Sequence, residues 1–192
     1  MLKTFHAAHK SERFADLFLW ADEDKPDITN TKMTPTIKNC GYILLAGYKT
    51  ETSLTNDHTK SLWQKFMKDR MLMPERFGTR YFSVSQYPID YFDYFDPSKE
   101  YTKWATMETP GNSPDFMETL EIMDGTYAVF IHHGPAVLAF KTFHYIFNEW
   151  LPNSGFELDQ RPHFEIMPEG YKTDDPNAVE EVWIPIKNKT VE

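Results

Sequence analysis

The sequence has almost no cysteine, few basic residues and no long apolar run. Its single cysteine, Cys40, excludes an internal disulfide framework and is typical of a reducing compartment. It has 20 lysines and arginines against 29 acidic residues, a net charge of −9, which argues against a nucleic-acid-binding surface. No segment approaches the length of a membrane span, and the start lacks the pattern of a signal peptide. We therefore expect a cytoplasmic protein that binds neither nucleic acid nor membranes.

Motifs for metals, nucleotides and cofactors are also missing. There is no H-E-x-x-H, C-x-x-C, G-x-G-x-x-G or P-loop pattern. His132 and His133 are adjacent, and adjacent residues of a strand point to opposite faces. Asp90, Asp93 and Asp96 recur at every third position but lack the glycine and terminal glutamate of a calcium-binding loop. We expect no metal site and no cofactor, and interpret the three aspartates as part of a solvated loop.

The composition is that of a folded domain, and the same order of elements is predicted twice. Hydrophobic residues make up 41% of the chain and aromatic residues 16%. In the first half, a strand, a helix and two strands are predicted at residues 38–50, 56–73, 81–87 and 101–108, with Asn56 or Asp57 as the helix N-cap. In the second half, the same elements are predicted at residues 121–132, 134–152, 163–167 and 180–187.

The offset of roughly 80 residues indicates an internal duplication. We predict an α+β domain of duplicated βαββ units over residues 36–192, with half-repeats at about 36–110 and 120–188. Its sheet should be rich in antiparallel strands, with one helix per unit and a ligand cleft between the halves.

Residues 1–35 lie outside this repeat. Apolar side chains at helical spacing in Ser11–Ala21 predict a short amphipathic helix. Such a helix packs either on the domain or on a second subunit, so the chain is compatible with a homodimer. The segment is too short and too acidic for a helix-turn-helix reader of DNA.

One carboxylate, Glu165, interrupts the otherwise apolar strand at residues 163–167. It shares a strand face with His163. Burying a lone carboxylate is costly unless something pairs with it. Three alternatives remain open: an exposed position on an edge strand, a pair with Arg161 or Arg80, or a place in an apolar site where a bound cation supplies the missing charge.

Three aromatic residues on predicted strands, Trp183, Trp104 and Tyr127, are candidates for the walls of such a site. Aromatic faces attract cations by about 0.5–2 kcal/mol each. The alternative for each is ordinary core packing. Trp150 and Phe147 lie in the middle of the apolar arc of the second helix, and we expect them in the core.

At these residues the chain resembles the GyrI-like effector-binding family. That family supplies the ligand domains of many AraC-type and MerR-type regulators and also exists as free-standing proteins. The matching segments, in the family's order and roughly its spacing, are Gly125–Phe130 with Gly134, Glu149–Pro152, Phe164–Glu165 and Ile184–Lys187. The resemblance covers about residues 36–187 and implies a duplicated βαββ fold with a hydrophobic cleft, in which a glutamate at the position of Glu165 meets cationic aromatic ligands. The chain departs from the regulators in lacking a DNA-binding domain.

The sequence thus predicts cytoplasmic binding of amphipathic, cationic aromatic small molecules, as in multidrug-binding ligand domains. Glu165 would supply charge, and Trp183, Trp104 and Tyr127 would supply aromatic faces. The alternative is an enzyme, since some family members hydrolyse cyclopropane-containing electrophiles. Glu165 would then be the general base, and Tyr127 or Tyr145 would donate a proton. A third alternative is binding to a protein, since some relatives act on DNA gyrase.

Overall fold

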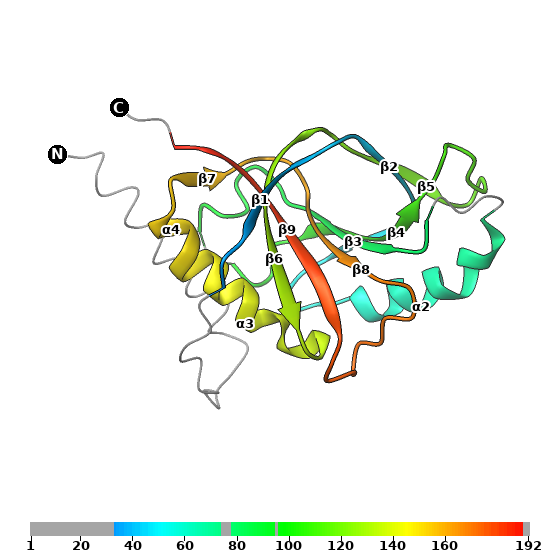
Figure 1. Ribbon diagram of the computed structural model, residues 1–192. Coiled ribbons are helices and arrows are strands. Elements are labelled where there is room, and N and C mark those ends of the chain that lie inside the picture. The colour runs from blue at the N-terminus through cyan, green and yellow to red at the C-terminus, as the bar shows by residue number, and fades with distance from the viewer. Residues whose placement is uncertain (1–32, 74–77, 95, 190–192) are drawn as a thin grey trace.

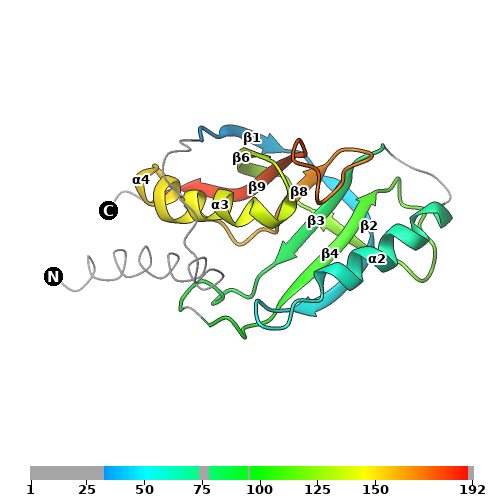
Figure 2. The ribbon, with the colours of Figure 1, turned by 90° about the horizontal axis from the view of Figure 1, so that it is seen from below.

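The computed structural model describes residues 33–73, 78–94 and 96–189, which form one antiparallel sheet with helices on one of its faces (Figure 1 and Figure 2). The nine strands are β1 (Thr36–Cys40), β2 (Ile43–Thr52), β3 (Tyr81–Gln86), β4 (Tyr101–Glu108), β5 (Glu118–Ile122), β6 (Gly125–His133), β7 (Phe156–Leu158), β8 (His163–Met167) and β9 (Val179–Asn188). The helices are α2 (Thr59–Asp69), α3 (Ala139–His144) and α4 (Leu151–Asn153), with 3₁₀ turns at Arg70–Leu72 and Ala136–Leu138 and a π-helical turn at Tyr145–Trp150. The predicted α+β class is confirmed. The helix predicted at residues 11–21 lies outside the described residues.

The two halves of the chain meet at the centre of the sheet. Neighbouring strands follow the order β1-β6-β9-β8-β3-β4-β2-β5, and β7 pairs with the end of β9. One half contributes β2-α2-β3-β4 and the other β6-α3-β8-β9, so the strand–helix–strand–strand order occurs twice. The halves join where β3 pairs with β8, and there Ser83 lies opposite Glu165. Figure 2 shows α2 over one half and α3 over the other, both on the same face.

Two strands that the sequence predicts as continuous are each divided in two. Residues 38–50 span parts of β1 and β2, and residues 121–132 span parts of β5 and β6. β1 pairs with β6, whereas β2 pairs with β4 and β5. The chain therefore passes from one end of the strand order to the other just after Cys40, and passes back just after Ile122. The apolar pattern does not reveal these breaks, because β1 and β5, although mostly exposed, each end on a buried residue, Cys40 and Ile122, that is followed closely in sequence by the buried stretch of β2 or β6.

The predicted helix ends also need correction. α2 begins after His58, whose side chain makes no capping hydrogen bond, so Asn56 and Asp57 are not the N-cap. Asp57 still stabilises the start of the helix, because its Oδ1 accepts a hydrogen bond from the backbone N–H of Thr59 at 2.8 Å. Pro152 does not end the second helix, because the helical backbone continues through Asn153, the last residue of α4, and becomes extended only at Ser154.

Each face of the sheet has its own core. On the helix face, α2 packs against β2 and β4 around Phe66, and α3 with the π-helical turn packs against β6 and β9 around Phe147. The opposite face encloses a third cluster, because the two ends of the strand order curl toward each other (Figure 1). Its buried members include Leu45, Ile122 and Phe164. The predicted core position of Phe147 is confirmed, and Trp150 packs at the margin of the same cluster.

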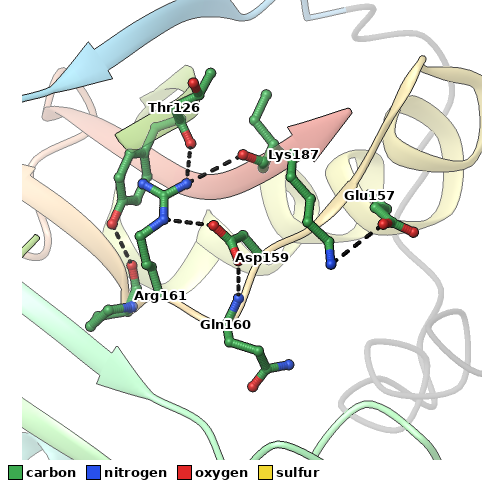
Figure 3. A network of polar contacts seen from close by, with 9 residues as sticks. Thr126, Glu157, Asp159, Gln160, Arg161 and Lys187 are labelled. Carbon is green, nitrogen blue, oxygen red and sulfur yellow. Dashed lines mark hydrogen bonds and ion pairs between the residues drawn. The ribbon is translucent and has the colours of Figure 1, made fainter. Parts of the chain in front are cut away.

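Arg161, in the connection between β7 and β8, ties three segments together (Figure 3). Its Nε donates to Asp159 at 2.7 Å, and its Nη2 donates to the backbone oxygens of Thr126 at 2.7 Å and Ile186 at 3.3 Å. A side chain at Gly125 would collide with the guanidinium, which explains glycine at the start of β6. The predicted strands 163–167 and 180–187 are thereby anchored to β6 at their neighbouring ends.

Replacing Arg161 by lysine is expected to lower the free energy of unfolding by about 1–3 kcal/mol. A lysine cannot donate to a carboxylate and two carbonyl oxygens in the fixed fork of a guanidinium. Urea unfolding followed by circular dichroism measures the change. The matched control is Lys187→Met, which removes the exposed pair between Lys187 and Glu157 seen beside Arg161 in Figure 3, at 3.4 Å. That loss should stay below about 1 kcal/mol; equal losses in both variants would contradict the role of Arg161.

Candidate functional site

Glu165 lies at the centre of the sheet, on the face that carries the helices. β8 is flanked by β9 and β3, so Glu165 is not on an edge strand and that alternative is wrong. Successive residues of β8 alternate between faces. Phe164 and Ile166 enter the enclosed cluster, and Glu165 therefore points with His163 to the helix face.

The partner of Glu165 is a lysine from the other half of the chain. Lys103 Nζ on β4 lies 3.2 Å from Glu165 Oε2 and donates a hydrogen bond to Ser85 Oγ at 3.0 Å. The side chains of Lys103 and Glu165 are only 9% and 16% exposed. The predicted arginine partners lie elsewhere, since Arg161 pairs with Asp159 and Arg80 with Glu108. Glu165 is thus part of a buried ion pair that spans β3.

A second acid, Glu180, is buried on the same face of the neighbouring strand β9. Burial, with a smaller effect of the negative charge of Glu165, raises the pKa of Glu180 to about 7. Lys103 and Tyr171 act in the opposite direction. The Tyr171 hydroxyl is close enough to Glu180 to affect its pKa, although it makes no hydrogen bond of normal geometry.

Aromatic rings border the ion pair on one side. The His163 ring lies 5.0 Å from the ring of Tyr87 and stacks on Phe92 at 5.6 Å and Phe147 at 6.1 Å. Tyr87 also contacts Tyr101, with ring centroids 4.9 Å apart. The charge of Glu165 contributes to the raised pKa values of Tyr87 and Tyr101, after the larger effect of burial, so both hydroxyls lie within its field.

The structure places the three aromatic residues predicted for the site on the opposite face. Trp183 stacks on Phe164 with ring centroids 5.2 Å apart, and Tyr127 contacts the same ring at 5.2 Å. Trp104 belongs to the same enclosed cluster. Trp183 and Trp104 lie in the same cross-strand row as Phe164, one position away from Glu165. Tyr127 lies on the same face, two residues along β6 from Val129, the residue that pairs with Trp183. They are therefore not brought together with the carboxylate.

Tyr145, the other predicted proton donor, lies in the π-helical turn that follows α3. It packs against the core beneath that helix, around Phe130 and Ile184. Tyr127 shares neither this environment nor the face of Glu165. In the hydrolase alternative, Tyr127 therefore cannot donate a proton to a substrate whose attacking water is activated by Glu165.

The aromatic rings that do border Glu165 come from the connection between β3 and β4, in which only the aspartates had suggested a role. Tyr87, Tyr91 and Phe92 lie between β3 and β4 and pack against Tyr101 and His163. Four of the eight residues from position 87 to 94 are aromatic, which is unusual for a solvated loop. This density of aromatic residues could have indicated that the segment packs against the rest of the domain.

Metal and membrane features are absent from the described part of the chain. Within residues 33–73, 78–94 and 96–189, no three His, Cys, Asp or Glu side chains lie together as a metal site would need. Asp90 instead pairs with Lys99 at 3.0 Å, and Asp96 accepts a hydrogen bond from Ser98 Oγ at 2.6 Å. Over the same ranges, no helix has the length and apolar character to cross a membrane.

Comparison with known families gives the class of this domain. Residues 33–187 match the model of the GyrI-like small molecule binding domain. The chain belongs to the GyrI-like family, as the resemblance in its second half implies, and it is a small-molecule-binding domain. A search of curated proteins found no match.

Solved structures share the fold at low sequence identity. SAV2435 bound to tetraphenylphosphonium is 15% identical, with a TM-score of 0.62 over 81% of this chain and 94% of that one. The C-terminal domain of EcmrR is 13% identical, with a TM-score of 0.63 over 83% and 100%. An integron cassette protein from the mobile metagenome of Vibrio cholerae is 12% identical, with a TM-score of 0.58 over 82% and 100%. At such identities the likeness shows the fold alone.

Proposed function

We propose that the domain binds amphipathic organic cations carrying aromatic groups on the helix face of the sheet, beside Glu165. The observation that carries the proposal is the charge balance of that face. Among the described residues, two largely buried carboxyl groups, on Glu165 and Glu180, lie near one lysine, Lys103, which forms its ion pair with Glu165. A cation there gains from the excess acid, and aromatic rings such as those of Tyr87 and Tyr101 add about 0.5–2 kcal/mol each.

Tetraphenylphosphonium is a suitable probe, because SAV2435, a structural neighbour, is bound to it. Isothermal titration calorimetry would compare it with triphenylphosphine oxide, which is aromatic but uncharged. We expect the cation to bind more tightly to the wild-type protein. Replacing Glu165 by glutamine should weaken its binding by about 2–5 kcal/mol, because the positive charge of Lys103 then stands without its partner. Near-equal affinity of the wild-type protein and Glu165→Gln for tetraphenylphosphonium would contradict the proposal.

The control variant is Glu157→Gln, which makes the same change in net charge at an exposed position paired with Lys187. It should bind tetraphenylphosphonium like the wild type. Circular dichroism checks that Glu165→Gln remains folded.

Mass spectrometry on cyclopropane-bearing compounds tests the hydrolase alternative. Products with water added, formed only when Glu165 is present, would establish hydrolysis instead of simple binding.

A further inference from the structure

The buried acids on the helix face differ in their partners. Glu165 has Lys103 at 3.2 Å. Glu180 is 6% exposed, and no lysine, arginine or histidine of the described residues forms an ion pair with it. The carboxyl group that lacks a counter-ion is therefore Glu180 and not Glu165, the acid that stands out in the sequence.

The groups around Glu180 do not supply that counter-ion. Glu165 pairs with Val182, so it lies diagonally across from Glu180 on the same face and adds a like charge. His132 lies directly across on β6, but burial lowers its pKa and its Nδ1 is 2.8 Å from Thr142 Oγ1. Tyr171 offers only a neutral hydroxyl, and Lys103 is already engaged by Glu165.

A buried carboxyl group without a counter-ion keeps its proton, because the charged form is the one that burial penalises. The raised pKa of Glu180, about 7, agrees with this expectation. Below this pH and without ligand, the ion pair of Glu165 and Lys103 carries charges that cancel, and Glu180 beside it is neutral. A cation that enters can be neutralised only if this acid ionises or if Lys103 gives up Glu165.

We infer that an organic cation bound on the helix face replaces the proton of Glu180, so that binding releases one proton to solvent and becomes tighter as the pH rises. The inference rests on the proposed function and adds the acid that carries the ligand's charge. The Glu165–Lys103 pair stays intact, and no covalent bond other than the O–H bond of Glu180 is broken. Because Glu180 has a single proton to release, the site selects ligands that carry one positive charge.

The sign of the pH dependence follows from proton linkage. Below the pKa of free Glu180, each binding event must expel a proton, so the affinity should rise about tenfold for each pH unit. Above that pKa the acid is already ionised and the affinity should level off. Between pH 5.5 and 8.5 the total increase should therefore be on the order of thirtyfold.

Tetraphenylphosphonium tests the inference cleanly, because its charge does not change with pH. Calorimetric titrations from pH 5.5 to 8.5, in buffers with different ionisation enthalpies, give the affinity and the number of protons released. At pH 6 the wild-type protein should release close to one proton. Glu180→Gln should release none and should lose the pH dependence. Glu181→Gln, the control on the opposite face of the same strand, can still accept the hydrogen bond from Trp183 Nε1 and should behave like the wild type.

Equal affinity of the wild-type protein at pH 5.5 and 8.5 would overturn the inference and leave the proposed function standing. No binding at any pH would overturn both.

The pH dependence of thermal unfolding, measured without ligand, tests the pKa of Glu180 even if Glu180→Gln fails to bind. Because its pKa is raised on folding, Glu180 makes the wild-type protein less stable as the pH rises from about 4.5 to 7. Glu180→Gln should remove that loss from thermal unfolding curves, and an unchanged pH profile in the variant would contradict the assignment.

Discussion

Replacing Lys103 by methionine is expected to lower the free energy of unfolding by about 3–5 kcal/mol at neutral pH. The substitution removes the one ionic partner that Glu165 has among the described residues, while leaving the carboxylate largely buried between β3 and β9. It also removes the donor to Ser85 Oγ. Methionine keeps nearly the same length, so the loss reports the charge and not a cavity. Urea unfolding of both proteins at pH 7 measures it.

Two further variants separate the buried pair from lysine loss in general. Lys49→Met removes an ion pair to Glu118 in which both side chains are exposed, and should cost about 0–1 kcal/mol. The double variant Lys103→Met/Glu165→Leu replaces the buried pair by apolar side chains and should recover most of the lost stability. A single Lys103→Met variant as stable as the wild type would contradict the burial of the pair.

The partner of Glu165 illustrates what the sequence could not supply. The strands at residues 101–108 and 163–167 were predicted with their observed bounds. Their apolar pattern shows that both are buried, but not that β3 lies between them. Only the pairing of β3 with both strands puts Lys103 and Glu165 on one face, diagonally across β3, where Ser85 lies opposite Lys103 and Ser83 lies opposite Glu165. Register between distant strands is a tertiary property that local pattern does not specify.

The aromatic residues predicted for the site also show that strand register could not be predicted from the sequence. Trp104, Tyr127 and Trp183 were predicted on the correct strands. The family followed from the motifs in the second half of the chain, and the repeated order of elements indicated the duplication. The face of the sheet to which each residue points is set by the pairing of its strand with its neighbours, which puts it on the face of either Glu165 or Phe164. A shift of one residue in register exchanges the two faces. The predicted site therefore combined residues that the sheet separates.

Below pH 6.5 the wild-type protein should lose stability that a His163→Phe variant keeps. The His163 ring is buried against Tyr87, Phe92 and Phe147, and burial, with a smaller effect of Lys103, lowers its pKa to about 3. Folding then favours the neutral ring. Since the unfolded chain binds the proton near pH 6.5, this contribution is complete above that pH and is lost as the pH falls toward 3.

The expected loss is about 1.4 kcal/mol for each pH unit below 6.5, or roughly 2–3 kcal/mol at pH 4.5. Urea unfolding of both proteins at pH 7 and 4.5 gives it as the change in their difference. Phenylalanine can keep the ring stacking, and His133→Phe, at an exposed position on β6, is the matched control. Glu180 acts in the opposite direction over part of this range, but it is present in all three proteins and cancels in the difference. If the wild type and His163→Phe lost stability in parallel, His163 would have to reach water or a carboxylate when it is protonated. The aromatic rings around it would then be a mobile cover and not a fixed wall beside Glu165.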